Sequence, residues 1–513
     1  IDEEKCVNCH VCISACPVKL CNDGSGNSVV IDHDLCIGCG ACIAACSHGA
    51  RSIVDDFDSF HKSLEEHEKI VAIVAPSVAS NFPHAYLHLN GWLKAQGVEA
   101  VFDVSFGAEL AARSYADYLH RQKPKMVIAQ PCSSIVTFIE IYHPELIPYL
   151  MPVDSPMVHT IKMIRQFYPQ YHQHKIVMLS PCVSKKREMD AVGMGDYNVV
   201  FSSLDAYFKK EHINLREYPA VNYDGPSPER AVLFPTPGGL LRTVKREIQD
   251  ISRYTRQISG VKRVYRYLLG LPRALSRDRA PLLVDCLSCE NGCNAGPGSL
   301  NIDLCVDETD YYIEERKEKQ CNYYSMLPKQ TSNNSDDLYA VIDAYRDEKL
   351  YIREYHDLSD NNRLLLPDEL EKKAIYKQMY KQSQEDFLNC AACGYGRCED
   401  MALAIYNGLN KTENCHRYRG VRLEIERKLA QEESEKARQL AQEAEKAHQE
   451  VLELMAVRQD IEVRKKVEQE LREKYEILDS ILQNMPIMMV AFNDKGQIAF
   501  WNRECEQITG YSS

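Results

Sequence analysis

The chain has 513 residues, too many for a single hydrophobic core, so two to four domains are expected. Its 61 basic and 74 acidic side chains give a formal net charge of −13. Because neutralising phosphates needs a basic surface, this charge argues against a nucleic-acid partner. No apolar run approaches the roughly 18–20 residues that cross a bilayer, so we expect no membrane span.

The 21 cysteines are the most informative part of the composition. Most of them fall into spacings typical of metal ligands rather than of disulfides. Thiolate ligands of iron–sulfur clusters need a reducing compartment, so the expected location is the cytoplasm, most naturally of an anaerobe. The thiols interpreted as ordinary residues without ligand spacing are Cys21, Cys305, Cys321 and Cys505.

Residues 1–60 contain two copies of one cysteine spacing. CVNCHVCISACP and CIGCGACIAACS both have the ferredoxin pattern C-x2-C-x2-C-x3-C, in which the fourth cysteine of each run serves the other cluster. This predicts two 4Fe–4S clusters. Zinc or disulfides are the alternative, but zinc sites lack the doubled spacing. The predicted ligands are Cys6, Cys9, Cys12 and Cys46 for the first cluster and Cys16, Cys36, Cys39 and Cys42 for the second.

Residues 68–310 alternate short apolar runs with amphipathic stretches. IVAIVAP, MVIAQP, KIVMLSP and APLLVD are typical of buried strands, and LDAYFKKEH is typical of a helix. This alternation predicts an α/β domain with largely parallel strands. In such domains, ligands bind beyond the carboxyl ends of the strands.

Three of the expected strands end at cysteines. QPCSS contains Cys132, SPCVSKK contains Cys182, and CENGC contains Cys289 and Cys293. Isolated free cysteines are usually small core residues. Four thiols at equivalent strand ends favour instead a shared 4Fe–4S cube at one edge of the sheet.

Residues 390–415 contain another ligand spacing. CAACGYGRC followed by Cys415 reads C-x2-C-x4-C-x16-C, which suits a further 4Fe–4S cluster, with zinc as the alternative. Gly394 and Gly396 let the backbone turn tightly between ligands. The predicted ligands are Cys390, Cys393, Cys398 and Cys415.

The C-terminal part of the chain has two features. In residues 419–482, small and apolar residues recur three and four apart from Ala437 to Ile461, which predicts a coiled coil and a homodimer. Arg458 and Lys465 interrupt this seam, and a solvated single helix is the alternative. Residues 483–513 resemble the start of a PAS sensor domain, with a helix, the strand MPIMMVAF, the turn NDKG and the strand IAFWN.

The strand-end motifs together resemble those of the FeFe hydrogenases. Residues 70–300 are similar to the catalytic domain of that family, and residues 1–310 to a ferredoxin-fused member. The family carries an H-cluster, a 4Fe–4S cube joined to a two-iron site with carbonyl, cyanide and azadithiolate ligands. The resemblance implies Cys132, Cys182 and Cys289 as cube ligands and Cys293 as the bridge to the two-iron site.

The resemblance also implies roles for residues around the two-iron site. Lys185 would hold one cyanide by a charge-assisted hydrogen bond, although a surface lysine is the alternative interpretation. Pro76 and Ser77, in APS, resemble the segment around the other cyanide. FGAEL at 106–110 and PGG at 237–239 match further family landmarks.

The motifs depart from the family at the proton route. Conventional members relay protons through a cysteine where this chain has Pro131, and AARSYADY replaces an acidic pair after FGAEL. The second motif begins with Ser180 in place of methionine. Because each proton transfer needs a donor and an acceptor, the ordinary route is expected to be broken. The candidate substitutes are Cys286, Asp285, His143 and Glu140.

These features resemble the sensory type of FeFe hydrogenase. We expect slow, reversible oxidation of H2 to protons and electrons, exchange of electrons with ferredoxin or a similar carrier, and signalling to a downstream domain or protein. A catabolic ferredoxin-dependent hydrogenase and a non-catalytic iron–sulfur protein are the alternatives.

The expected fold is an α+β multidomain chain that binds an H-cluster and three further 4Fe–4S clusters. Its expected parts are a ferredoxin fold with two clusters (1–60), an α/β H-cluster domain with parallel sheets (68–318), a linker and helical extension containing NNSDD (319–385), a small helical 4Fe–4S domain (386–418), a coiled-coil helix (419–482) and a truncated PAS domain (483–513).

Overall fold

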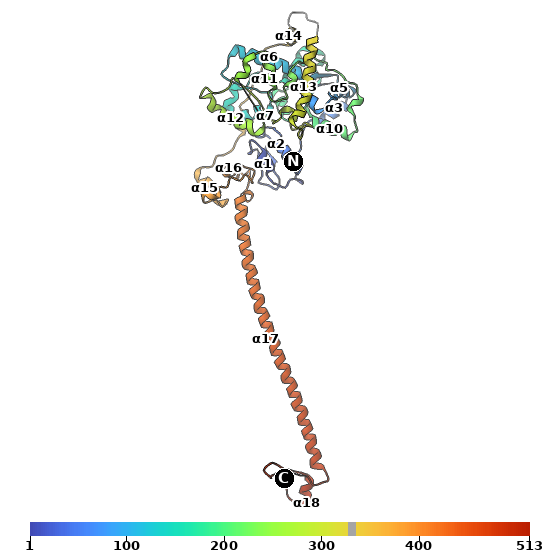
Figure 1. The fold of residues 1–513 in the computed structure, drawn as a ribbon, viewed down its shortest axis with the longest axis vertical. Helices are drawn as coiled ribbons and strands as arrows, with labels where there is room; N and C mark the ends of the chain where they lie inside the picture. The colour runs from blue at the N-terminus through green and yellow to red at the C-terminus, as the bar shows by residue number, and fades with distance from the viewer. Residues whose placement is uncertain (327–334, 513) are drawn as a thin grey trace. The chain divides into compact units, whose positions relative to one another are not determined.

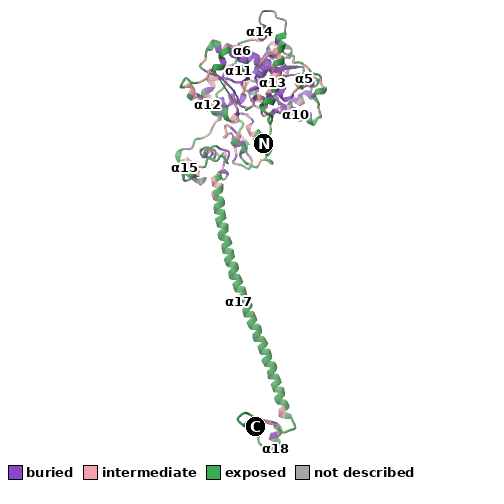
Figure 2. Ribbon diagram, in the orientation of Figure 1, coloured by how far each residue is buried: buried purple, intermediate pink, exposed green. Residues whose placement is uncertain are grey.

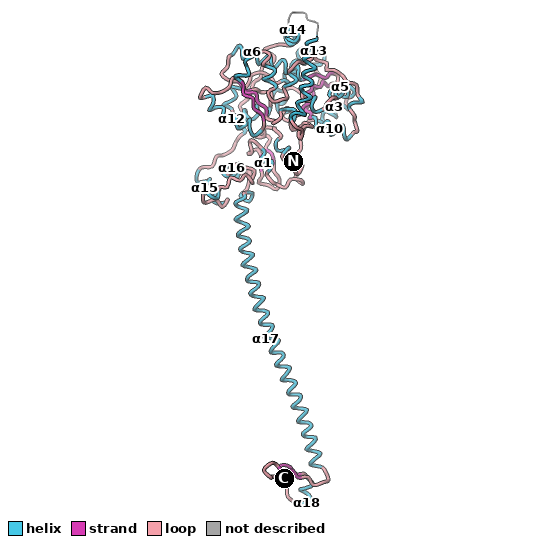
Figure 3. Tube along the Cα trace, viewed as in Figure 1, coloured by secondary structure: helices cyan, strands magenta, loops and turns pink. Residues whose placement is uncertain are grey.

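The computed structural model describes residues 1–326 and 335–512 and divides into two compact units, residues 1–419 and 420–513 (Figure 1). In the larger part of the first unit, strands lie among helices (Figure 3). The mixed α/β class with parallel sheets that the sequence predicts is confirmed.

The N-terminal domain repeats one small motif. Its elements are α1 (Val11–Ala15), β1 (Asn22–Asp23), β2 (Val30–Ile31) and α2 (Ala41–Ala44), and the two strands pair antiparallel. Each helix contains the third cysteine of its run and follows a residue in the left-handed region, His10 at φ 63° and Gly40 at φ 73°. The doubled cysteine spacing therefore folds into two equivalent turns.

Two parallel sheets form the centre of the next domain. The larger sheet has the order β4-β3-β6-β7 and the smaller the order β5-β9-β8. Strands β3 and β9 are buried along their whole length, which explains their continuous apolar sequences. The strands are β3 (Ile70–Val74), β4 (Ala100–Asp103), β5 (Val127–Ile128), β6 (Lys175–Ser180), β7 (Tyr197–Val200), β8 (Thr255–Ser259) and β9 (Leu283–Leu287).

Helices connect these strands, and capping residues fix where several of them begin. The Asp103 carboxylate accepts a hydrogen bond from the Ser105 amide at the start of α6, and the Ser155 hydroxyl caps α8. The helices are α3 (Phe57–Glu65), α4 (Val78–Asn81), α5 (Tyr86–Ala95), α6 (Val104–Gln122), α7 (Ser133–Tyr142), α8 (Pro156–Phe167), α9 (Lys185–Val192), α10 (Phe201–Lys210), α11 (Gly239–Val244), α12 (Val261–Leu275) and α13 (Val306–Met326).

Residues 335–358 differ from the linker expected for this region. Leu338 and Ile342 in α14 (Ser335–Ala344) are buried in the core of the larger sheet, as is Tyr351. The Tyr355 hydroxyl donates to the carbonyl of Met151 at 2.6 Å. Apolar side chains four residues apart on α14 give it a face to bury, so the segment belongs to the α/β domain. The two asparagines of NNSDD lie outside the described residues, and 335–337 begin α14.

The C-terminal elements are helices, apart from one hairpin that precedes the last helix. They are α15 (Glu369–Gln378), α16 (Cys398–Tyr406), α17 (His416–Asn484), β10 (Val490–Phe492), β11 (Ile498–Trp501) and α18 (Arg503–Thr509). The 69-residue α17 has no buried residue and is exposed along its length (Figure 2). A helix here is confirmed, whereas its pairing as a coiled coil and the PAS resemblance stay predictions. None of the described helices combines the length and hydropathy needed to cross a membrane.

Candidate metal centre

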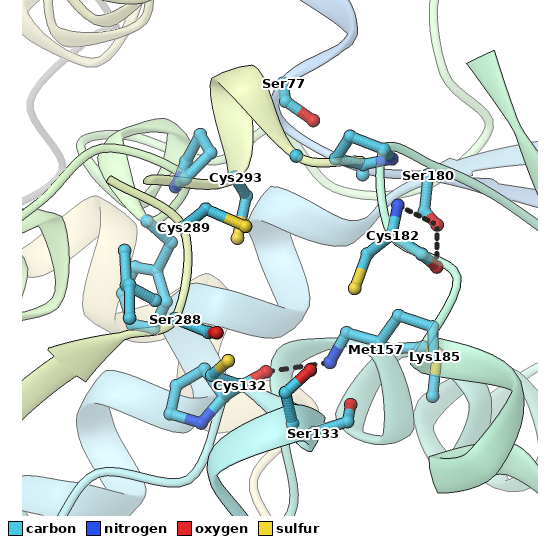
Figure 4. A pocket seen from close by; sticks show the side chains of 18 of the residues that line it. Ser77, Cys132, Ser133, Met157, Ser180, Cys182, Lys185, Ser288, Cys289 and Cys293 are labelled. Atoms are coloured by element: carbon cyan, nitrogen blue, oxygen red, sulfur yellow. Dashed lines mark hydrogen bonds between the residues drawn. The ribbon is translucent and has the colours of Figure 1, made fainter. Parts of the chain in front are cut away.

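Cys132, Cys182, Cys289 and Cys293 line one cavity at the carboxyl ends of the parallel strands. Figure 4 shows their sulfurs directed toward a common space. Cys132 and Cys289 follow strands of the smaller sheet and Cys182 follows β6 of the larger one, so two sheets contribute, not the single sheet edge expected.

The four sulfurs surround a space rather than a point. Among the residues that the structure describes, no three His, Cys, Asp or Glu side chains converge closely enough to hold a single metal ion. Four cysteines around one cavity suit a cluster of several metal atoms bound by four thiolates.

The loop that carries Cys293 is held by close backbone contacts. Gly292 has φ +67°, and a Cβ there would stand 2.2 Å from the carbonyl oxygen of Pro235. The Cys293 amide donates to that same carbonyl at 2.7 Å. Gly298 donates to the carbonyl of Pro181 at 2.8 Å, which ties the third motif to the second.

Ser180, which stands where the family has methionine, holds the second motif. Its hydroxyl accepts from the Cys182 amide at 3.2 Å and lies 3.0 Å from Oδ1 of Asn198. Ser180 therefore holds the loop that carries the predicted ligand Cys182.

Lys185 is the first residue of α9 and lines the cavity. Its Nζ donates to the Pro131 carbonyl at 2.8 Å and forms an ion pair with Glu188 Oε2 at 2.7 Å. Burial alone would lower the pKa of Lys185, but Glu188 and Cys182 offset this and raise it, so the amine is a cation. Burial alone would raise the pKa of Glu188, but Lys185 and Arg353 lower it.

Glu188 was missed by the sequence reasoning. It also accepts from the Ser133 hydroxyl at 2.9 Å, and Ser133 is the neighbour of Cys132. An acidic residue one helical turn after Lys185 was the available signal, because side chains three apart share a helix face.

Ser77 and Pro76 also line the cavity. Ser77 is fully buried, and its hydroxyl has no hydrogen-bond partner among the described protein atoms. Buried hydroxyls are rarely left unpaired, so this one suits a bound group that accepts a hydrogen bond. Cyanide is such a group, and the residues present therefore fit the ligands that the resemblance implies.

Three thiols of the cavity are poor acids without a bound cation. Burial, reinforced by neighbouring cysteines, raises the pKa of Cys132 and of Cys289, and raises that of Cys293 to about 12. Thiolate ligands here therefore require a metal centre to offset the cost of their charge.

The four candidate proton-relay substitutes do not form one connected group. Asp285 accepts from the Leu241 amide at 3.1 Å, and the Cys286 thiol lies 3.7 Å from the Ala129 carbonyl, both buried on β9. His143 pairs with Glu145 at 3.0 Å. Glu140 differs from these, because it lines a second cavity that it shares with Ser133, Glu188 and Arg353.

The N-terminal cysteines approach the central cavity through Cys39, which is part of its lining. Cys21 was interpreted as an ordinary residue, but its buried sulfur lies 3.6 Å from the sulfur of Cys16. The Asn22 amide donates to Cys21 at 3.3 Å. At the predicted first ferredoxin cluster, the Arg51 guanidinium donates to the Cys12 sulfur at 3.2 Å.

Two family models match parts of the chain. Residues 68–297 match the family model of the iron only hydrogenase large subunit, C-terminal domain, and residues 1–19 and 29–52 match the 4Fe-4S binding domain. The chain therefore carries an FeFe hydrogenase catalytic domain and ferredoxin-type 4Fe–4S motifs.

Solved FeFe hydrogenase structures are similar to the chain at low identity. One, from a study of oxygen inactivation, is 16% identical with a TM-score of 0.47 and covers 59% of this chain and 99% of that one. A glutamate-to-alanine variant of HydA1 from Chlamydomonas reinhardtii is 16% identical with a TM-score of 0.43 and covers 60% of this chain and 100% of that one.

Proposed function

We propose that the protein binds an H-cluster and oxidises H2 slowly and reversibly, as a sensor of hydrogen or redox state. The observation that carries this proposal is the single cavity at the strand ends. It combines four cysteine sulfurs, the buried ammonium of Lys185 and the unpaired hydroxyl of Ser77.

In this proposal, each residue has a definite task. Cys132, Cys182 and Cys289 would hold the cube, Cys293 would hold both the cube and the two-iron site, and Lys185 and Ser77 would hold cyanide ligands. When bound, the two-iron site would supply the heterolytic cleavage of H2, which no side chain can perform. The chain would position it among apolar side chains, with the Lys185 cation beside it.

Slow turnover is supported by Pro131 and by the contacts of Glu109. Pro131 lines the cavity, and proline carries no acidic proton in its side chain or at its nitrogen. Glu109, in FGAEL, is fully buried, pairs with Arg246 at 2.8 Å and accepts from the amides of Glu229 and Ala231. These bonds give Glu109 a structural role.

The proposed output uses the remaining parts of the chain. Electrons would pass between the central cavity, the N-terminal clusters and a carrier such as ferredoxin. The signal would pass through α17, as a coiled coil in a homodimer, and the PAS-like segment to a downstream domain or protein. The long exposed apolar side chains of α17, among them Leu440, Leu454 and Ile461, support such pairing.

Hydrogen-dependent dye reduction tests the proposal. Protein assembled with a complete H-cluster under anaerobic conditions should reduce a viologen with H2 far more slowly than a conventional hydrogenase. Turnover equal to that of conventional enzymes would favour the catabolic alternative. A fully assembled protein that never reduces the dye would favour the non-catalytic alternative.

A further inference from the structure

Another cavity, separate from the two described above, is lined by four cysteines near the start of α17. Cys390, Cys393, Cys398 and Cys415 all line it. The cations that share this lining are Lys381, Arg397 and Arg417. A 4Fe–4S cube bound by four thiolates has a net negative charge, which these cations would offset.

The ligand loop of this site packs against the N-terminal domain. Gly394 has φ +91°, and a Cβ there would stand 2.8 Å from the Cβ of Ile13 and 3.0 Å from the carbonyl oxygen of His10. Ile13 follows Cys12, a predicted ligand of the first ferredoxin site, on α1. The loop between Cys393 and Cys398 therefore touches the helix that carries Cys12.

Hydrogen bonds fix this contact. The Lys19 ammonium donates to the carbonyl of Gly394 at 3.0 Å. The Gly24 amide donates to the Leu409 carbonyl at 2.8 Å, and the Asn414 side-chain amide donates to the Gly24 carbonyl at 3.1 Å. Asn414 is buried, so at least this bond is shielded from water.

The two sites also share one apolar core. Cys12 belongs to the same buried cluster as Cys393 and Cys415, with Cys42 of the second run packed against it. Cys39, a predicted ligand of the second ferredoxin cluster, lines the central cavity. Ligand-bearing segments therefore touch one another from the central cavity to residues 390–415.

We infer that the 390–415 site holds a 4Fe–4S cluster that is the outer end of the electron route, reached from the central cavity through the two N-terminal sites. Electron tunnelling falls steeply with distance, so centres whose ligand shells touch exchange electrons well. Cys415 is followed by His416, the first residue of α17, so the electron arrives at the start of that helix.

The electron count for this route balances. Because the inference rests on the proposed function, the electrons come from H2. One H2 gives two protons and two electrons, and each electron takes one cube from the 2+ to the 1+ state. Two cubes are reduced for each H2, and the protons leave to solvent.

The experiment uses the full chain with all clusters assembled, reduced under H2 or by dithionite and followed by electron paramagnetic resonance. The Cys390→Ala/Cys398→Ala variant identifies the signal of the 390–415 cluster as the one that it lacks. Cys6→Ala/Cys9→Ala removes two ligands of the first ferredoxin site, where Cys9 is exposed and Cys6 half-buried. Cys46→Ala removes a different ligand of that site, and Cys305→Ala, at an exposed thiol, is the matched control.

H2 should reduce the 390–415 cluster in the wild type and in Cys305→Ala. Without the first ferredoxin site, H2-driven reduction of that cluster should be lost while dithionite still reduces it. Equal H2-driven reduction with and without the first site would overturn the inference.

A second measurement separates this inference from the proposed function. If H2 reduced no cluster at all, the proposed function would fail, but dithionite would still reduce every cluster. Spin relaxation of the reduced 390–415 cluster should then be faster in the wild type than without the first site. Identical relaxation in both proteins would show that the two clusters are not neighbours.

Discussion

Lys185 and Glu188 form an ion pair of 2.7 Å, with side chains that are 13% and 6% exposed, at the beginning of α9. The same Glu188 oxygen accepts from Ser133, and Lys185 also donates to the carbonyl of Pro131. The pair therefore links the second motif to the first across the proposed metal centre.

Removing the cation of this pair should destabilise the protein. Lys185→Met leaves the Glu188 carboxylate buried, with Arg353 at 3.7 Å as its nearest remaining cation. Breaking a buried pair costs about 3–5 kcal/mol, and denaturant unfolding at matched cluster content measures it. Lys186→Met is the control, because this neighbouring lysine is 39% exposed and its pairs contribute less than about 1 kcal/mol. Equal losses in the two variants would contradict the structural role of the pair.

Restoring the family's cysteine should not by itself restore fast turnover. In Pro131→Cys the new thiol would lie at the cavity, but Glu109 is held by Arg246 and no acidic pair follows FGAEL. A relay needs every donor and acceptor in reach, so H2 oxidation by the assembled variant should stay near the wild-type rate. A rise to the rate of conventional enzymes would show that the rest of a route is intact.

Asp285 should make stability depend on pH. Burial raises the pKa of Asp285 to about 6, above the usual value of 3.8. The folded state therefore binds more protons than the unfolded state between about pH 4 and 6, and stability falls as pH rises through this window. Asp285→Asn removes this loss, so the variant should gain up to about 3 kcal/mol relative to wild type at pH 8 and much less at pH 4. A difference that is the same at both pH values would contradict the assignment.

Cys21 should tune the second ferredoxin cluster. A thiol at 3.6 Å from Cys16 can donate to the ligand sulfur and so favours the more negative, reduced cluster. Cys21→Ala should lower the midpoint potential of that cluster by roughly 40 mV, the one-electron equivalent of about 1 kcal/mol. A spectroscopic redox titration measures this, with Cys305→Ala as the control. An unchanged potential would mean that the thiol makes no such bond.

The sequence predicted those parts of the site that have local signatures. The apolar runs ending at Cys132, Cys182 and Cys289 were predicted as strands, and the structure places strands at all three positions. Their parallel pairing could also be predicted, because each returns after a helical connection. Their division between two sheets could not, because strand order depends on contacts between residues far apart in the chain.

Contacts that depend on tertiary packing could not be predicted from the sequence. Cys21 lies outside the ferredoxin spacing, and its approach to Cys16 depends on the turn between α1 and β1. Residues 335–358 are polar enough to look like a linker, yet Leu338 and Ile342 are buried against the larger sheet. Burial of this kind is set by tertiary packing, which a local pattern does not reveal.

The most direct test of the account is the infrared spectrum of the protein after assembly with its two-iron unit. The account predicts carbonyl and cyanide stretching bands in the wild type and no such bands in Cys293→Ala. The bands should also appear in the control variant Cys286→Ala, because the buried Cys286 thiol faces the Ala129 carbonyl. Absence of the bands from a fully assembled wild type, or their survival in Cys293→Ala, would contradict the claim that these four strand-end sulfurs hold an H-cluster.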